Sequence, residues 1–423
     1  MLFDSLHFAP WWYDAGSLRR VIVDLLAGEM ASMRPGSRHL PLPWPDTLDL
    51  KSDLGADSLD LMGLATAMET VLHLGQGSSR DGEPGAALLA HTGLTDWLQV
   101  ARSGLEAGGA ALTFRTSGSS GAPKPCTHAL AWLEQEAAVL ASLFTGRRRI
   151  VSLVASHHIY GFLFTVLLPR ALGLHEGDVA DLRALAPGQL AAALRPGDLV
   201  IGYPDFWRAF GARGDAESAL DVVGVSSTAP CPDEVARAVL SAGLARLVQV
   251  YGSSETAGVG WRDAADSDYR LFAYWRRAAQ ANQLERTVPG GAQHAVALPD
   301  RLAWTDEDRF RPIGRVDLAV QVGGVNVFPS YVADVLKLHP DVLEVSVRPM
   351  RADEGQRLKA FVVPRHAMGQ DAGAAAPALR AALQAWCAQR LAAPECPAVF
   401  SIGPALPRGA SGKLADWIID AWL

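Results

Sequence analysis

The pattern of hydrophobic and polar positions changes twice along the chain. In the first hundred residues, apolar side chains recur at intervals of three and four over Leu18–Leu26 and again over Leu61–Leu72, which predicts two amphipathic helices. Ser17 is expected to cap the first helix, and the second is expected to begin near Asp57-Ser58. A further short helix is predicted from Thr95 to Val100. This segment is therefore expected to be a small helical bundle with long connections.

Beyond this segment, short runs of Val, Leu and Ile alternate with helical patterns. Strands separated by helices are typical of βαβ units with a parallel sheet, in which ligands bind at the carboxyl ends of the strands. The predicted strands are Ile150–Val154, Leu199–Ile201, Val222–Val225 and Leu247–Val250, and a helix is predicted over Pro232–Leu244.

The last hundred residues show a third pattern, in which apolar runs surround a helix that begins near Ser330 and an Ala-rich helix follows over Ala372–Cys387. The predicted strands are Leu318–Val322, Val342–Val347 and Leu358–Val363. We therefore expect an α/β fold with three parts. Residues 1–107 form a helical segment, residues 108–316 a large domain with parallel sheets, and residues 317–423 a small α+β domain.

Composition and charge argue against several classes of protein. The 423 residues carry 38 Lys and Arg against 45 Asp and Glu, so there is no basic surplus for binding nucleic acid. The most apolar stretch, Tyr160–Leu168, is shorter than the ~20 residues of a membrane-spanning helix. No secretory signal is recognised at the start, so a cytoplasmic protein is expected. The four cysteines lack metal-ligand spacing and are expected to be reduced thiols: Cys126, Cys231, Cys387 and Cys396.

The sharpest local signal is TFRTSGSSGAPK, residues 113–124, where a strand end runs into a loop of Ser, Thr and Gly with one Lys. Glycines let backbone N–H groups approach an anion, hydroxyls add donors and the lysine adds a charge, so this loop can cradle phosphate. It does not have the GxxxxGKS or GxxxxGKT spacing of a Walker loop, and a flexible linker is the alternative. The candidate phosphate ligands are Thr116, Ser117, Gly118, Ser119, Ser120, Gly121 and Lys124.

With five further stretches, this loop resembles the adenylate-forming superfamily of acyl-CoA synthetases, aryl-acid ligases and peptide-synthetase adenylation domains. The phosphate loop of that family reads S/T-S-G-S/T-S/T-G-x-P-K. The other stretches follow in the order of the family: HHIYG at 157–161, STAP at 227–230, YGSSE at 251–255, GRVDLAVQVGGVNVFP at 314–329 and LPRGASGKL at 406–414. The resemblance covers about three quarters of the chain, from Gly108 to Leu423.

The resemblance implies two charged catalytic residues. Glu255 follows a predicted strand, where a carboxylate can hold Mg²⁺ against the phosphates of ATP while Ser254 offers a hydroxyl. Lys413 lies in the segment from which the family inserts a lysine to stabilise the negative charge that develops when a carboxylate attacks the α-phosphate. Outside their motifs, both would be expected to be solvated side chains.

The resemblance also implies a nucleotide site. Adenine is a flat π system suited to the aromatic face of Tyr251 and to a turn of small residues. Asp300 stands where the family places a ribose-binding Asp, although Asp306 or Asp308 could take that role because the usual TGD is missing. Arg315 is expected to reach the ribose or the phosphates. The implied nucleotide-binding residues are Thr228, Ala229, Pro230, Tyr251, Gly252, Ser254, Asp300 and Arg315.

The sites for the acid and the thiol are implied in the same way. His158 matches a histidine near the carboxylate of the acid, and a packed core histidine is the alternative interpretation. Asp317 has the hinge position of the small domain. The remaining expected residues are Ile159, Tyr160, Tyr203 and Val259 around the acid, and Gly323 and Gly324 along the tunnel of the thiol.

The first hundred residues depart from the family. DLGADSLDLMGLATAMETVL, residues 53–72, resembles an acyl carrier protein, in which a serine at a helix start carries phosphopantetheine. Ser58 is the candidate attachment site. A serine at this position can equally be a helix N-cap, and a degenerate carrier fold that covers the surface of the ligase is our preferred interpretation.

We therefore expect an ATP- and Mg²⁺-dependent acid–thiol ligase that forms acyl-AMP and transfers the acyl group to the phosphopantetheine thiol of an acyl carrier protein or of CoA. A resemblance to short bacterial ligases of aryl polyene and pigment pathways favours an aromatic acid, such as 4-hydroxybenzoate or a hydroxycinnamate. Two alternatives stay open. One is a non-catalytic carrier or scaffold with a decayed ligase half, and the other is an adenylating enzyme that forms amides.

Overall fold

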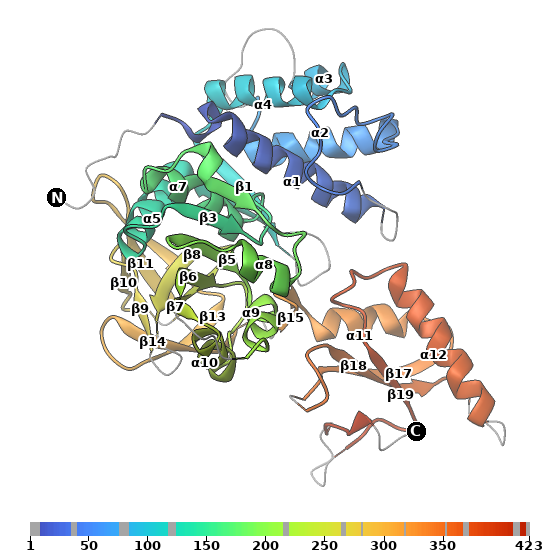
Figure 1. Cartoon of the computed structure of the whole chain (residues 1–423). Coiled ribbons are helices and arrows are strands. Elements are labelled where there is room, and N and C mark those ends of the chain that lie inside the picture. Colours follow the sequence, from blue (N-terminus) through green and yellow to red (C-terminus); the bar gives the residue numbers. More distant parts are fainter. Residues whose placement is uncertain are drawn as a thin grey trace. The chain divides into compact units, whose positions relative to one another are not determined.

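The computed structural model describes residues 9–34, 40–75, 84–116, 124–214, 220–263, 268–280, 282–316, 319–351, 353–366, 372–408 and 415–419 (Figure 1). The chain divides into two compact units. The first comprises Met1–Arg115, Pro125–Leu298 and Leu302–Pro312, and the second comprises Thr116–Lys124, Pro299–Arg301 and Ile313–Leu423. Among the described residues, no helix is both long and apolar enough to cross a membrane.

The largest sheet has nine strands in the order β13-β14-β9-β8-β7-β6-β5-β3-β4. Five neighbouring strands, β7, β6, β5, β3 and β4, run parallel to one another. Parallel strands are covered on both faces, so their sequences are nearly continuous apolar runs, and four of the five were predicted for this reason. The parallel strands are β3 (Arg149–Ser152), β4 (Val179–Asp181), β5 (Asp198–Gly202), β6 (Leu220–Ser226) and β7 (Leu244–Ser253).

The sheet continues with antiparallel strands that the sequence did not predict. β8 pairs with β7, β9 with β8, and β14 with β9. A separate antiparallel sheet has the order β10-β11-β12. The bounds are β8 (Ala257–Arg262), β9 (Tyr269–Leu271), β10 (Trp275–Arg277), β11 (Gln283–Thr287), β12 (Gln293–Ala297), β13 (Asp300–Trp304) and β14 (Arg309–Arg315).

Helices cover both faces of the parallel strands. Ile150 and Val151 of β3 belong to different hydrophobic clusters, because successive side chains of a strand point to opposite faces. One face packs against α5 and the segment from α6 to α7, and the other against α8, α9 and α10. The bounds are α5 (Leu130–Leu143), α6 (Ile159–Phe162), η2 (Leu163–Leu167), α7 (Leu168–Ala171), η3 (Glu176–Asp178), α8 (Pro187–Ala193), α9 (Pro204–Gly211) and α10 (Asp233–Ser241).

The N-terminal helices share a core with the sheet. Trp11, Leu26, Met68 and Trp97 are all buried in the hydrophobic cluster that also contains Ile150. The division at residue 107 stays a prediction, and this shared cluster argues for one body on both sides of it. The elements are η1 (Trp11–Tyr13), α1 (Ala15–Met33), α2 (Ser58–Leu72), α3 (Pro84–Leu89) and α4 (Leu94–Gly108), followed by the paired strands β1 (Ala111–Thr116) and β2 (Lys124–Ala129).

Aspartates cap the first two long helices. The backbone N–H of Ser17 donates to Asp14 at 2.6 Å, so Asp14 is the N-cap of α1 and the prediction of Ser17 as the cap was wrong. In α2, Asp57 and Asp60 form a capping box, which leaves Ser58 as the first residue of the helix. A carboxylate can accept the hydrogen bond of a backbone N–H at the start of a helix as well as a hydroxyl can. The hydrophobic pattern therefore could not show whether Asp14 or Ser17 is the cap.

The second unit contains the small α+β fold that the sequence predicts. Its main sheet has the order β17-β18-β19, with the first pair antiparallel and the second parallel. Val332 of α11 and Leu383 of α12 are buried in one cluster with Val345 and Ala360 of the sheet. The elements are β15 (Val320–Val322), β16 (Val325–Val327), α11 (Pro329–Lys337), β17 (Val342–Pro349), β18 (Leu358–Pro364), α12 (Ala372–Ala388) and β19 (Val399–Ile402).

Candidate active site

The candidate residues of the first unit follow the carboxyl ends of neighbouring parallel strands. His158 comes after β3, Tyr203 after β5, Thr228 after β6, and Glu255 directly after β7. These four strands lie side by side in the sheet, and the carboxyl ends of parallel strands share one edge. Ligands of such sheets bind at this edge, so the topology brings together motifs that are up to a hundred residues apart in the sequence.

The turn after β6 is rigid and strained. Thr228 has a φ of 77°, in the left-handed region that a β-branched residue rarely adopts. The hydroxyl of Ser227 donates to the carbonyl oxygen of Val250 at 2.8 Å and fixes the turn to the neighbouring strand β7. Thr228 and Pro230 are exposed. Strained backbone of this kind is concentrated at binding sites, which fits the expected role of the turn against adenine.

The turn that carries Glu255 is held from two sides. Within it, the hydroxyls of Ser253 and Thr256 are 3.0 Å apart. From outside, Nε2 of the buried His128 lies 2.7 Å from the carbonyl oxygen of Ser254, to which it must donate. Burial lowers the pKa of His128, so the ring is held neutral with its proton on Nε2. Glu255 is half-buried at the tip of this fixed turn.

The surroundings of Glu255 fit a magnesium ion that is bound together with a nucleotide. Mg²⁺ is usually bound through one or two carboxylates, with phosphate oxygens and water completing its shell. In the described part of the chain, no group of three His, Cys, Asp or Glu side chains could hold a metal by itself. A Mg²⁺ ion that is bound by the phosphates of a nucleotide needs only one carboxylate from the protein, and Glu255 at the carboxyl edge of the sheet can supply it.

A second buried carboxylate supports the strand that follows Glu255. Glu136, on α5, is fully buried, and the backbone N–H of Gly258 donates to its Oε1 at 2.9 Å. Burial raises the pKa of Glu136 to about 7, against the opposing effect of Arg286. The Gly258 position requires glycine, because a Cβ there would lie 2.3 Å from the same carboxylate oxygen.

This carboxylate should make stability depend on pH. The ordinary pKa of Glu136 is 4.5 and its folded value is about 7, so the folded state binds the proton more tightly. The free energy of unfolding should therefore fall as the pH rises from 4.5 to 7, and level off above 7. Glu136→Gln should remove this fall and stabilise the protein at pH 8 by up to about 3 kcal/mol.

Urea unfolding of the wild type and of Glu136→Gln from pH 5 to 8 measures the effect. Glu106→Gln, at an exposed position on α4, is the control and should keep the wild-type profile. Parallel profiles for the wild type and Glu136→Gln would show that Glu136 is ionised in the folded protein throughout this range.

Tyr251 is supported by other aromatic rings. Its ring centroid lies 5.7 Å from that of Tyr269 and 5.4 Å from that of Phe310, and the side chain is half-buried. Gly252 allows β8 to approach closely, since a Cβ at this position would lie 2.2 Å from the carbonyl oxygen of Ala257. Packing alone therefore explains why an aromatic residue stands at Tyr251 and a glycine at Gly252, in addition to the nucleotide role that the resemblance implies.

The second unit brings Asp300 and Arg315 together. Their Oδ1 and Nη1 atoms are 3.8 Å apart, and the side chains are 13% and 10% exposed. The two competing aspartates, Asp306 and Asp308, are exposed, and Asp308 is paired with Arg270 at 3.8 Å. Asp300 therefore lies beside Arg315, while the two competing aspartates lie in a surface turn, and the nucleotide-binding role of Asp300 stays a prediction.

The histidine motif packs tightly behind the strand edge. The rings of His157 and His158 are 4.0 Å apart, and burial lowers the pKa of His157. His158 is exposed and Ile159 is half-buried. Tyr160 is buried, and its hydroxyl donates to the carbonyl oxygen of Gly202 at 2.9 Å, which ties the motif to β5.

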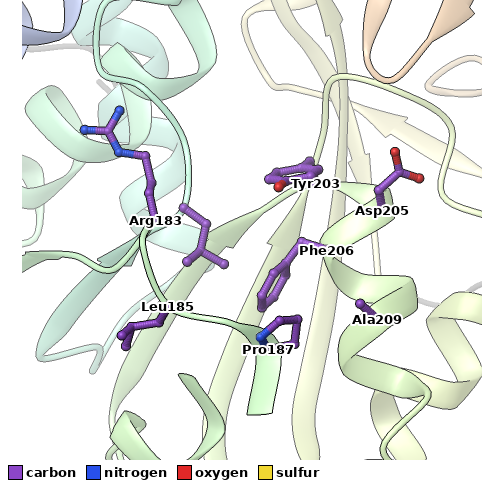
Figure 2. A pocket seen from close by; sticks show the side chains of 8 residues that line it. Arg183, Leu185, Pro187, Tyr203, Asp205, Phe206 and Ala209 are labelled. Atoms are coloured by element: carbon purple, nitrogen blue, oxygen red, sulfur yellow. The ribbon is translucent and has the colours of Figure 1, made fainter. Parts of the chain in front are cut away.

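A pocket of about 230 Å³ lies at the carboxyl ends of β3, β4 and β5. Figure 2 shows Tyr203 and Phe206 on one side, Arg183 on the other and Pro187 below. Of the five residues expected around the acid, the pocket contains Tyr203 alone, and Val259 is buried in the main cluster. The lining residues are Leu153, Arg183, Leu185, Pro187, Tyr203, Asp205, Phe206 and Ala209.

Sequence reasoning missed most of this lining. Phe206 reads as an ordinary apolar position of a helix, and Arg183 as one of many surface arginines. The signal that could have found them is their place in the chain, because each follows shortly after a strand that ends at the edge carrying His158. Aromatic and aliphatic walls with a few charged residues, here Arg183 and Asp205, are the usual composition of a pocket for a small organic ligand.

Several predicted site residues lie outside the described residues: Ser117, Gly118, Ser119, Ser120, Gly121, Asp317 and Lys413. The chain on either side of two of these segments is described. Thr116 ends β1 and Lys124 begins β2, so the predicted phosphate loop connects two paired strands. The backbone N–H of Ala415 donates to the carbonyl oxygen of Pro407 at 2.9 Å, which closes the base of the segment that carries Lys413.

Gly323 and Gly324 form the turn of a tight hairpin. Val322 of β15 pairs with Val325 of β16, and the two glycines between them have φ values of 58° and 82°. Two consecutive left-handed residues define a type I′ turn, for which glycine and asparagine are preferred. A Cβ on Gly323 would meet no atom within 4 Å, so the backbone conformation and not crowding within the chain requires this glycine.

Two substitutions at Gly323 distinguish its role in the turn from its expected role in the tunnel of the thiol. Gly323→Ala should destabilise the protein by about 1 kcal/mol, because alanine resists the left-handed conformation. Gly323→Asn tolerates that conformation but adds a side chain, so it should keep the stability and slow thioester formation from acyl-AMP. Unfolding temperatures and single-turnover transfer rates measure the two effects. A wild-type transfer rate for Gly323→Asn would contradict a role in passing the thiol.

Ser58 is exposed and is the first residue of α2, so the interpretation of this serine as the helix N-cap was wrong. Because Asp57 caps α2, the Ser58 hydroxyl is not needed as a cap. The side chains of Leu61 and Leu64 are buried in the cluster shared with the sheet. Modification of Ser58 stays a prediction.

The four cysteines are free thiols, and only Cys396 is partly exposed. Burial raises the pKa of Cys387 to about 12 and also raises those of Cys231 and Cys396. This agrees with the expectation of reduced structural thiols.

Comparisons with known proteins define the class. The family model described as AMP-binding enzyme matches residues 64–274, and the one described as AMP-binding enzyme C-terminal domain matches residues 331–413. The chain belongs to the adenylate-forming superfamily of AMP-binding enzymes, in its class of AMP-forming acid–thiol ligases. The predicted superfamily, fold class and enzyme class are thereby confirmed.

Individual relatives cover almost the whole chain. It is 38% identical over 410 residues to a 4-coumarate–CoA ligase of Halorhodospira halophila, covering 95% of this chain and 99% of the relative. It is 35% identical over 423 residues to a 4-coumarate–CoA ligase of Cereibacter sphaeroides, covering 96% and 97%. The fold is similar to the amide bond synthetase McbA of Marinactinospora thermotolerans, with a TM-score of 0.58, 16% identity and coverage of 94% and 92%.

These matches include the N-terminal helical segment. The AMP-binding family model begins at residue 64, inside α2, and both ligases align over at least 95% of this chain. The helices before the phosphate loop are therefore part of what the chain shares with these ligases. The comparisons give no support to a carrier-protein origin of this segment or to a pigment pathway.

Proposed function

We propose that this protein activates an aromatic acid of the hydroxycinnamate class, such as 4-coumarate, as acyl-AMP and transfers the acyl group to the thiol of CoA. The observation that carries the proposal is the alignment, over 95% or more of the chain, with two proteins named 4-coumarate–CoA ligase. The aromatic side chains of Tyr203 and Phe206 in the pocket agree with an aromatic ring as part of the substrate.

The predicted site residues would provide the parts that adenylation needs. The turn at Thr228 and the ring of Tyr251, which packs against Phe310, would bind adenine. Glu255 would hold Mg²⁺, which when bound neutralises phosphate charge and orients the α-phosphate for attack. Asp300 and Arg315, which lie 3.8 Å apart, would bind the ribose and phosphates. Lys413 would stabilise charge on the α-phosphate during attack by the carboxylate.

The choice of CoA over an acyl carrier protein follows from the names of the relatives alone. We therefore place the carrier protein second as acceptor. Amide formation is a further alternative, for which the similarity to McbA is a similarity of fold only.

The decisive experiment combines two assays on the purified protein. ATP–pyrophosphate exchange is measured with 4-coumarate, 4-hydroxybenzoate, a fatty acid and an amino acid, and the product with CoA, a carrier protein or an amine is then identified by mass. Exchange with 4-coumarate and a CoA thioester as product supports the proposal. Exchange with another acid, or transfer only to an amine, would replace the proposed substrate or acceptor, and silence of the folded protein with all acids would favour the scaffold alternative.

A further inference from the structure

One face of α1 contacts the segment that carries the two histidines. Arg20, Asp24 and Gly28 are spaced by four residues, so they lie above one another on the same side of the helix. All three touch residues 156–165, which begin at the carboxyl edge of β3 and continue into α6 and η2. The interface joins parts of the first unit that are more than 130 residues apart in the sequence.

Asp24 makes the central contact. Its side chain is 2% exposed, and its Oδ2 accepts a hydrogen bond of 2.6 Å from the backbone N–H of Ser156, the residue before His157. Its Oδ1 accepts a 2.7 Å hydrogen bond from Nη2 of Arg183, which lines the pocket. Burial raises the pKa of Asp24, while Arg183 and the Ser156 N–H oppose that rise. One buried carboxylate therefore holds both the histidine loop and a wall of the pocket.

Arg20 and Gly28 hold the same segment on either side of Asp24. The guanidinium of Arg20 donates to the carbonyl oxygen of Thr165 at 3.3 Å, and the hydroxyl of Thr165 is 2.9 Å from that of Ser156. At Gly28, a Cβ would lie 3.0 Å from Nε2 of His157. Nδ1 of His157 is buried without a hydrogen-bond partner among the described residues, so the ring is held in part by packing against Gly28 and the ring of His158.

The charge of Arg183 is already paired with two aspartates, so this residue contributes to the pocket through the packing of its side chain. Its guanidinium is bound by Asp24 and by Asp181, the latter at 2.5 Å. Figure 2 shows the guanidinium extending away from Tyr203 and Phe206, so that the aliphatic stem faces the pocket. If Asp24 were displaced, the stem of Arg183 would no longer be held at the side of the pocket. The loop that carries His158 would also lose its attachment to α1.

We propose that Asp24 is a positioning residue for the acid site, and that the N-terminal helix α1 is thereby a working part of the ligase. Through Ser156, Asp24 fixes the loop that carries His158, and through Arg183 it fixes the facing wall of the pocket. This inference rests on the proposed function, because it concerns the site of the acid.

The chain offers a matched control. Asp198 is an equally buried aspartate, 2% exposed, and its Oδ1 and Oδ2 accept hydrogen bonds of 2.9 and 2.6 Å from Arg149. Asp198 and Arg149 are the first residues of β5 and β3. They therefore lie at the amino edge of the same strands, opposite the candidate site. Asp198→Asn breaks a buried Asp–Arg pair of the same kind without touching the histidine loop.

The test compares Asp24→Asn and Asp198→Asn by ATP–pyrophosphate exchange with 4-coumarate and by thermal unfolding. Asp24→Asn should raise the KM for the acid and lower kcat/KM at least tenfold with an unchanged KM for ATP. Asp198→Asn should lower the unfolding temperature and leave kcat/KM for the acid within twofold of the wild type. Equal kcat/KM values for Asp24→Asn and the wild type, or an equal loss in both variants, would overturn the inference. A wild type that is silent with every acid would instead refute the proposed function.

A second variant decides the question if Asp24→Asn does not fold. Gly28→Ala improves the helix propensity of α1, so its unfolding temperature should be unchanged or higher. Its added methyl group must push the His157 ring by a few tenths of an ångström, and kcat/KM for the acid should fall at least threefold. A purely structural role of this interface predicts no loss of activity in a variant that is as stable as the wild type. Wild-type kinetics in Gly28→Ala would then overturn the inference.

Discussion

Replacement of Lys413 by Ala should abolish acid-dependent ATP–pyrophosphate exchange, with a loss of about 100-fold or more, and leave the fold intact. Attack of the carboxylate on the α-phosphate develops negative charge, and a lysine that reaches this charge stabilises the transition state more than the ground state. The fold should persist because the described residues that flank this segment are joined through the backbone, by a hydrogen bond from the N–H of Ala415 to the carbonyl oxygen of Pro407, which does not use the lysine side chain.

The same variant should separate the two half-reactions. If Lys413 acts in adenylation alone, Lys413→Ala should convert added acyl-AMP and CoA to the thioester at a rate close to that of the wild type. Lys337→Ala, at a 53% exposed position on α11, removes a lysine from the same unit and should leave both half-reactions unchanged. A wild-type exchange rate in Lys413→Ala would contradict the assignment of Lys413 as the catalytic lysine of adenylation.

Substitution of Glu255 by Gln should reduce adenylation about 100-fold or more through loss of the magnesium ligand. The amide has the shape of the carboxylate without its charge, and a neutral oxygen binds a hard divalent cation far more weakly. The turn itself should keep its conformation, because the contacts of Ser253 with Thr256 and of His128 with Ser254 do not use the Glu255 side chain.

The dependence on magnesium distinguishes this role from a structural one. Glu255→Gln should need a higher Mg²⁺ concentration for half-maximal exchange, and its unfolding temperature should match that of the wild type. Glu234→Gln, at an exposed position in the first turn of α10, is the control. An unchanged Mg²⁺ requirement together with a wild-type rate would remove Glu255 from the metal site.

The buried parallel strands could be predicted from the sequence, and the antiparallel ones could not. Runs such as Ile150–Val154 are apolar because helices cover both faces of the sheet. β12, by contrast, is mostly exposed, and β9 and β10 have three residues each, too few for an alternation to show. These strands exist because neighbouring strands supply partners for their backbone groups, which a local pattern does not contain.

Site residues that belong to sequence motifs could be predicted, and residues that reach the site only through tertiary contacts were missed. His158, Thr228 and Glu255 were expected because their motifs resemble those of the family, and Glu255 also because it follows a predicted strand. Asp24 was not, because its two partners, Ser156 and Arg183, lie 132 and 159 positions away in the sequence. On the pattern alone, Asp24 is a polar interruption in an apolar stripe.

The shared cluster has a consequence for synthesis of the chain. The cluster begins at Trp11 and is completed by Phe310. At ribosomal rates of roughly 5–20 residues per second, the second of these residues emerges on the order of 15–60 s after the first. Early in that interval, before the cluster residues from Leu112 onward have emerged, α1, α2 and α4 can bury their apolar faces only against one another. The nascent chain is therefore most open to chaperones and to aggregation before the last strands of the sheet have left the ribosome.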